Sequence, residues 1–183
     1  MSDIVEKFTT HLKNVLTRSL ILVAETGADT IMPEHLLWGV ATEQGSVGAE
    51  ILRKAHVNAD RLREFIGVPD SIPESTVAAS DALPRLSEQS KRVIEKAVLT
   101  ASVYEHRYVG TEHLIAGMLQ VGNARLASFF KTSNVNMEDI RHQLNTILKG
   151  TQLFPKILEN DQAPKHRAHV HDHEAEEEDD EEE

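Results

Sequence analysis

The chain has no cysteine among its 183 residues. A disulfide framework, a thiol nucleophile and a cysteine-ligated metal are therefore excluded. No apolar run approaches the roughly 20 residues that cross a bilayer. The N-terminal residues 1–7 also lack the basic stretch and apolar core of a signal peptide. A chain of this kind suits a reducing compartment, and we expect a cytoplasmic protein.

Aromatic residues are scarce, at 4% of the chain, and there is no cationic excess because the net charge is −11. That charge is unevenly distributed. Residues 151–183 hold 12 acidic and 3 basic residues, a net of −9, and residues 1–150 hold 18 and 16, a net of −2. Nucleic-acid binding needs a basic stripe and usually exposed aromatic side chains. This sequence therefore gives no support to nucleic-acid binding.

Several catalytic motifs are missing as well. The sequence has no Gly-x-x-x-x-Gly-Lys-Ser/Thr loop to hold phosphates and no His-Glu-x-x-His zinc motif. No segment shows the alternating apolar pattern of a half-buried strand. The remaining periodicity is helical, which predicts an all-α fold.

One stretch occurs twice, and it organises the rest of the chain. Residues 33–39 (PEHLLWG) and 111–117 (TEHLIAG) lie 78 positions apart, and the same shift overlays residues 8–66 on 86–144 without a gap. Internal repeats must be recognised first because they determine the fold. We therefore expect two pseudo-symmetric four-helix repeats, about eight helices, within a domain over 1–150. Identical pairs include Lys13/Lys91, Glu34/Glu112, His35/His113, Gly39/Gly117 and Asn58/Asn136.

The apolar spacing predicts four helices in each repeat. In repeat one (8–66) they cover about 8–26, a short helix from Pro33 or Glu34, 46–55 and 58–66. In repeat two (86–149) they cover about 87–105, a short helix after Thr111, 123–132 and 136–149. Residues 67–85 contain three prolines and predict a linker. Residues 151–183, which end in nine acidic residues out of ten, have the composition of a disordered tail.

This double repeat resembles the N-terminal domain of Clp-type AAA+ unfoldases, above all through Tyr108–Gly117 (YVGTEHLIAG). The resemblance covers about residues 5–149. It implies an all-α module without catalytic activity that binds substrates, adaptors or subunits of a Clp unfoldase–protease system. The ATPase modules that follow the repeats in ring-forming members have no counterpart here, so we expect a stand-alone N-domain without a cofactor.

The resemblance also suggests two ligand sites. Thr9 and Lys13, like Ser87 and Lys91, are four residues apart at a helix start and so share a face. A hydroxyl and an ammonium at a helix N-terminus suit an anion, and a glutamate suits a guanidinium. Family members in Gram-positive bacteria use such groups to hold phosphoarginine. By that resemblance Glu34 with Thr9 and Lys13 forms one pocket.

The second pocket is expected to combine Glu112 with Ser87 and Lys91. Thr111 precedes Glu112 and keeps the family pattern, whereas Pro33 replaces the equivalent threonine in repeat one. A proline at that position removes a hydroxyl and a backbone donor. If only one site binds, we expect it to be the one that contains Glu112.

Simpler explanations of these residues remain open. Thr, Ser and Glu at helix starts are ordinary capping residues, and the lysines are compatible with solvated surface charges. Adjacent helical residues point about 100° apart, so Glu34 and His35 do not converge on one metal, and packed histidines are expected. The alternatives to a Clp-system module are an independent reader of phosphoarginine-marked proteins and a small metal-dependent hydrolase. The hydrolase has only the Glu-His pairs and the tail histidines, such as His166 and His173, in its favour.

Overall fold

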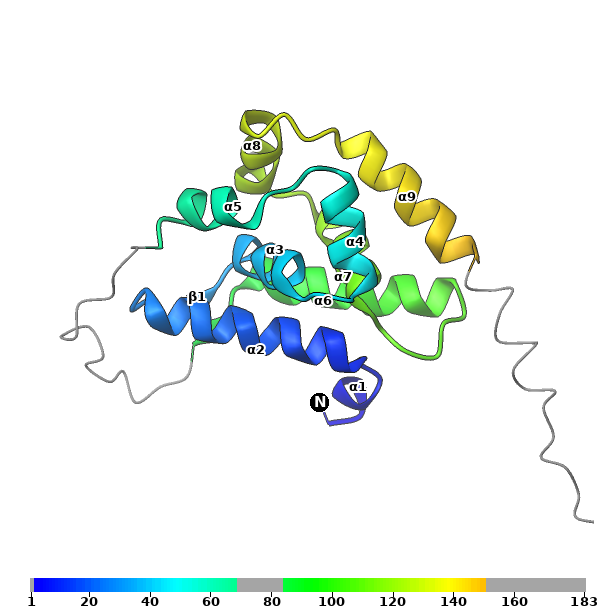
Figure 1. The fold of residues 1–183 in the computed structure, drawn as a ribbon. Coiled ribbons are helices and arrows are strands. Elements are labelled where there is room, and N and C mark those ends of the chain that lie inside the picture. Colours follow the sequence, from blue (N-terminus) through cyan, green and yellow to red (C-terminus); the bar gives the residue numbers. More distant parts are fainter. Residues whose placement is uncertain (1, 69–83, 151–183) are drawn as a thin grey trace, which may run out of the picture.

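The computed structural model describes residues 2–68 and 84–150. The fold is all-α apart from two very short strands, as predicted (Figure 1). A short first helix, α1 (Ser2–Glu6), was not predicted. Repeat one contains α2 (Thr10–Glu25), α3 (Pro33–Thr42), α4 (Val47–Lys54) and α5 (Ala59–Ile66). Repeat two contains α6 (Glu88–Val103), α7 (Thr111–Val121), α8 (Ala124–Thr132) and α9 (Met137–Gly150). No helix in the described ranges is both long and apolar enough to span a membrane.

The helix boundaries follow from capping residues that the sequence shows. Asn58 caps α5 by accepting from the backbone N–H groups of Asp60 and Arg61. Pro33 is the first residue of α3, where its missing N–H costs nothing. Asn136 accepts from the Glu138 N–H at the start of α9. These boundaries lie within two residues of the predicted ones.

Two parallel backbone pairings join the repeats, and the sequence analysis found neither. Strand β1 (Thr30–Ile31) pairs with β2 (Arg85–Leu86), which lies at the boundary between the predicted linker and repeat two. Phe8, which the repeat makes equivalent to Leu86, pairs in the same way with Val109, the equivalent of Ile31. Strands of two residues are too short to show an alternating pattern. Their hydrogen-bond partners are also far away in the chain, so the local sequence does not reveal them. Each pairing connects the start of one repeat's first helix to the start of the other repeat's second helix.

The two repeated glycines, Gly39 and Gly117, allow the first and second helices of each repeat to pack closely. A Cβ built on Gly117 would lie 2.3 Å from the carbonyl oxygen of Val93. On Gly39 it would lie 2.8 Å from both the Val15 carbonyl oxygen and Ser19 Oγ. The buried faces of both repeats merge into one apolar core. The predicted linker beyond Val68 and the predicted tail lie outside the described residues, except for residues 84–85.

Candidate functional site

The first and second helices of repeat one run antiparallel, which separates Thr9 from Glu34. Glu43 directly follows α3 and contacts His11, near the start of α2, through a 2.9 Å bond. The hydroxyl of Ser19, more than two turns further along α2, donates to the His35 carbonyl. Since a helix rises about 1.5 Å per residue, Glu34 lies roughly 15 Å from Thr9 along α2. The expected pocket of Glu34 with Thr9 and Lys13 is therefore wrong.

The structure instead brings Thr9 and Lys13 to the helix that carries Glu112. The Thr9 N–H donates to the Val109 carbonyl at 3.0 Å, and the Val109 N–H donates to the Lys7 carbonyl at 2.8 Å. Glu112 follows three residues later in the first turn of α7. We call Thr9, Lys13, Thr111 and Glu112 the Glu112 site.

The first helix of repeat two likewise contacts the second helix of repeat one. The Ser87 N–H donates to the Ile31 carbonyl at 3.0 Å, and the hydroxyl of Ser90 donates to the same carbonyl at 2.7 Å. Ile31 lies three residues before Glu34. Ser87, Lys91 and Glu34 therefore form the second group, the Glu34 site, and the expected pairing of Glu112 with Ser87 and Lys91 is also wrong. The repeat reveals equivalent residues but not which repeat supplies each wall.

The hydroxyls act as helix caps in both groups. Thr9 Oγ1 accepts from the Leu12 N–H at 3.2 Å, and Ser87 Oγ accepts from the Ser90 N–H at 3.0 Å. Lys13 is exposed, whereas the Lys91 ammonium lies 2.6 Å from Glu88. Each site thus has an N-terminus of a long helix, a hydroxyl and an exposed ammonium, which together can hold an anion.

Thr111 does not cap its helix, contrary to one expectation. Gly110 is the N-cap of α7, and Thr111 is the first helical residue with 2% exposure. Its hydroxyl oxygen accepts from the Gly48 N–H at 2.9 Å, so it satisfies the start of α4 in the other repeat. Thr111 therefore fixes the contact between the repeats.

The Glu112 carboxylate folds back over the start of its own helix. A Cβ on Gly110 would lie 2.5 Å from both carboxylate oxygens, so this conformation depends on the glycine. The Glu112 side chain is 17% exposed. The Glu112 carboxylate thus stays near the surface at the start of α7, next to the segment whose backbone pairs with Phe8 and Thr9.

Glu34 has a different environment because an arginine from repeat two reaches it. Its Oε1 lies 2.8 Å from Arg125 Nε, and its side chain is 4% exposed. Its Oε2 is buried without a hydrogen-bond partner. Sequence reasoning missed Arg125, because the repeat alignment pairs it with Val47 and gives no signal at that position.

The two histidines of the repeated stretch are buried helix-capping residues, as expected. His35 Nδ1 accepts from the Met32 N–H, and His113 Nδ1 accepts from the Gly110 N–H, both at 2.9 Å. This is the reciprocal half of a capping box. Burial, and after it the charge of Arg125, lowers the pKa of His35 to about 4.

His113 also lies 3.0 Å from Glu112 Oε1 through the same Nδ1. One nitrogen cannot accept from Gly110 and donate to Glu112 together, and we assign the neutral ring because the Gly110 N–H is buried and needs the acceptor. Nε2 then carries the proton and donates to Nδ1 of His106 at 2.7 Å. Within the described ranges no three His, Asp or Glu side chains are grouped to hold a metal ion. The tail histidines lie outside them.

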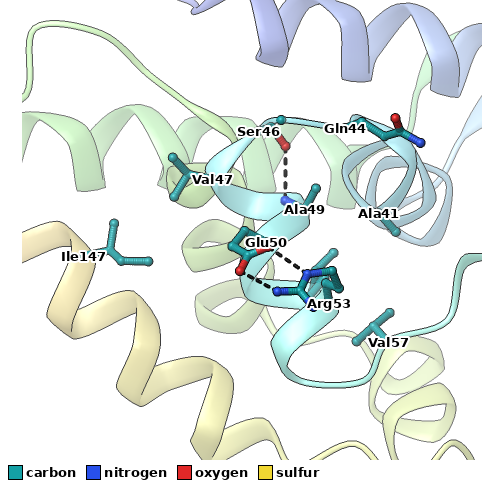
Figure 2. Close-up of a pocket in the computed structure, with 11 residues that line it drawn as sticks. Ala41, Gln44, Ser46, Val47, Ala49, Glu50, Arg53, Val57 and Ile147 are labelled. Atoms are coloured by element: carbon teal, nitrogen blue, oxygen red, sulfur yellow. Dashed lines mark hydrogen bonds and ion pairs between the residues drawn. The ribbon is translucent and has the colours of Figure 1, made fainter.

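A separate groove of about 730 Å³ opens between α3, α4 and α9 (Figure 2). Apolar side chains form most of its wall, and Gln44, Ser46, Glu50 and Arg53 also line it. Val47 is 43% exposed there. Figure 2 shows Val47 of α4 and Ile147 of α9 on one side of the groove, and Ala41 and Val57 on the other. The apolar lining residues are Ala41, Val47, Ala49, Leu52, Val57 and Ile147.

The corresponding groove of repeat two is much smaller, about 130 Å³. Met137 of α9 lines that groove, whereas the equivalent residue of repeat one is Ala59. A smaller side chain and a fourth helix of 8 residues instead of 14 leave the first groove open. Elsewhere on the molecule, an almost wholly apolar hollow of about 350 Å³ lies between α1 and α6, and Ile4 and Leu99 are among its lining residues.

The family model and the related proteins that match this chain point to the same family. The model of the Clp repeat (R) N-terminal domain matches residues 7–98 and 85–169. A probable ATP-dependent Clp protease ATP-binding subunit from Chlamydia pneumoniae is 28% identical over 153 residues, which is 81% of this chain and 17% of that protein. The chain thus spans under a fifth of the length of three curated relatives that it matches.

Solved structures show the same fold at low sequence identity. The N-terminal domain of ClpD from Arabidopsis thaliana superposes with a TM-score of 0.64 at 22% identity, covering 80% of this chain and all of that one. A ClpV N-domain in complex with a VipB peptide has a TM-score of 0.58 at 16% identity, covering 81% and 91%.

Proposed function

Because the chain belongs to the family of Clp repeat N-terminal domains, we propose that it is a non-enzymatic binding module. Its ligands are substrates, adaptors or subunits of a cytoplasmic Clp unfoldase–protease system. The relatives named above support this proposal, since one is an ATP-binding subunit of a Clp protease. A neighbour in fold holds a peptide in its solved complex.

The observation that carries the proposal is the groove between α3, α4 and α9 (Figure 2). Its volume of about 730 Å³ falls in the range of binding pockets, about 300–1,000 Å³. Apolar walls supply affinity, and the exposed Gln44 side chain can pair with the backbone of a bound segment. A peptide with two or three apolar side chains fits this chemistry.

Charge substitution in the groove tests the proposal. Val47→Asp places a carboxylate in the apolar wall, at a helix start where it does not oppose helix formation. Val103→Asp is the matched control, because Val103 is 75% exposed and lies on α6, away from the groove. Clp ATPase and protease subunits are expected to be retained by the wild type and Val103→Asp, and lost with Val47→Asp. Equal retention by both variants would remove the groove from the binding surface.

A second function, recognition of phosphoarginine on marked proteins, is favoured by the Glu112 site. The pairing of Phe8 with Val109 joins a hydroxyl, an exposed ammonium and a carboxylate at two helix N-termini. A phosphoarginine carries a phosphate and a guanidinium on one side chain, so it needs an anion site and a carboxylate close together. Thr9 and Lys13 would receive the phosphate, and Glu112 the guanidinium.

Titration with a phosphoarginine peptide tests this second function. Glu112→Gln keeps the shape of the side chain and removes its charge, so binding should weaken at least tenfold, about 1.4 kcal/mol. Glu138→Gln on α9 is the control, because that residue is an exposed carboxylate paired locally with Arg141. Unchanged affinity in Glu112→Gln, or no binding by the wild type, would exclude the site.

A further inference from the structure

The Glu34 site already contains a guanidinium, that of Arg125 on α8. Nε of Arg125 lies 2.8 Å from Glu34 Oε1. The same side chain donates from Nη2 to the Phe65 carbonyl at 3.3 Å. Its guanidinium carbon also lies 5.2 Å from the centroid of the Phe65 ring. Three contacts thus hold the arginine of repeat two against the carboxylate of repeat one.

Within residues 2–68 and 84–150, no arginine is paired with Glu112. The shift of 78 positions places Val47 where repeat two has Arg125, and Gln143 where repeat one has Phe65. Gly110 lets the Glu112 carboxylate fold over its own helix, whereas the equivalent residue of repeat one is Met32. The two glutamates therefore occupy equivalent sequence positions, but only the Glu34 carboxylate is paired with an arginine of the described residues.

The contact of Arg125 with Glu34 is incomplete. An arginine can bind a carboxylate through two parallel hydrogen bonds, but here Nε alone reaches it and Nη2 is used by Phe65. Oε2 of Glu34 stays buried without a partner, an arrangement that costs free energy. The Arg125 side chain is 51% exposed, so its guanidinium can turn toward solvent. A guanidinium from outside could then engage both carboxylate oxygens.

We propose that Arg125 is an internal competitor that closes the Glu34 site to guanidinium ligands until it is displaced. This inference rests on the proposed recognition of phosphoarginine and makes its two sites unequal. The Glu112 site binds first, and the Glu34 site binds weakly in the wild type. Removal of Arg125 opens the second site, with Ser87 and Lys91 beside it for the phosphate.

Calorimetric titration with a phosphoarginine peptide measures the number of sites. The wild type should bind one peptide, and Arg125→Met should bind two, because methionine keeps an apolar contact with Phe65 but has no charge. Affinity at the second site should rise about tenfold or more, since the wild-type site is open only in the fraction of molecules that Arg125 has left. Arg125→Met/Glu34→Gln should return to one peptide. Arg141→Ala, an exposed arginine in a local pair on α9, is the control.

The outcomes separate this inference from the function it rests on. If the wild type binds one peptide, Glu112→Gln abolishes binding and Arg125→Met still binds one, the gating role of Arg125 is refuted while the Glu112 site stands. If neither the wild type nor Arg125→Met binds, phosphoarginine recognition itself fails. An NMR spectrum of the arginine Nε–H groups gives an independent readout. The Arg125 signal should shift when excess peptide displaces it, and an unmoved signal at two bound peptides would contradict displacement.

Discussion

Glu43 connects the end of α3 to the first half of α2. Its replacement should lower the free energy of unfolding more than the replacement of a residue in an exposed ion pair does. Its carboxylate accepts from Asn14 at 2.8 Å and Arg18 at 2.8 Å and contacts His11 at 2.9 Å. The side chain is 5% exposed. Burial works to raise the pKa of Glu43, but the hydrogen bonds from these three residues and the charge of Arg18 lower it to about 2.

The free energy follows from that pKa with a correction for solvent. A decrease from 4.5 to about 2 corresponds to about 3 kcal/mol if nothing is screened. The partners Arg18 and His11 are 46% and 47% exposed, so water competes for both. We expect Glu43→Gln to cost about 1–2 kcal/mol, because the new amide N–H₂ meets the donors that the carboxylate accepted from.

Urea denaturation at pH 7 provides the measurement, with Glu50→Gln as the matched control. Glu50 also has a pKa lowered to about 2, through Arg53, but it lies on the surface in a pair within one helix. Its removal should leave the midpoint unchanged within error, because such pairs are screened and local. Equal losses in the two variants would show that burial and the link between helices contribute nothing.

The pH dependence of the Glu43 contribution has a definite sign. The folded-state pKa is lower than the unfolded value of 4.5, so the contribution is complete above pH 4.5 and disappears as the pH falls toward about 2. The stability difference between wild type and Glu43→Gln should thus be constant from pH 7 to 5 and shrink below pH 4.5. A difference that stayed constant down to pH 3 would contradict the assignment to the ionised carboxylate.

Three further predictions concern buried groups. Gly117→Ala should lower the free energy of unfolding, measured by urea denaturation, by about 3 kcal/mol, because its Cβ would meet the Val93 carbonyl oxygen at 2.3 Å and the packing strain exceeds the gain in helix propensity. An unchanged free energy of unfolding would mean that α6 and α7 separate freely. Thr111→Val should cost about 1–3 kcal/mol, since the buried Gly48 N–H loses its acceptor, and an unchanged thermal midpoint would refute that role. His35, with a pKa of about 4 instead of 6.5, should stay neutral in NMR titrations at pH 5, so stability decreases as the pH falls from 6.5 to 4; a ring protonated at pH 6 would contradict its burial.

The repeat and its local consequences could be read from the sequence because they depend on neighbours along the chain. Helix spacing, the Asn58 cap, Pro33 at a helix start and the packed state of His35 follow from residues within about four positions. These features need no knowledge of what lies across the core.

The composition of each candidate site needed the fold, because its members come from different repeats. The resemblance suggests that Thr9 and Glu34 of the same repeat form one pocket, whereas the antiparallel helices and the pairing of Phe8 with Val109 place Thr9 near the start of α7, which carries Glu112. Arg125 is equivalent to a valine and reaches Glu34 only because α8 packs near α3.

The sequence alone thus determined an all-α double repeat and the residue types available for binding, since both arise from local periodicity and side-chain chemistry. The tertiary structure decided which repeat supplies each wall, that Arg125 already pairs with Glu34 while no arginine in the described ranges pairs with Glu112, and that a groove opens beside α4. Each of these depends on contacts between residues that are far apart in the chain, and those contacts leave no periodic trace in the sequence.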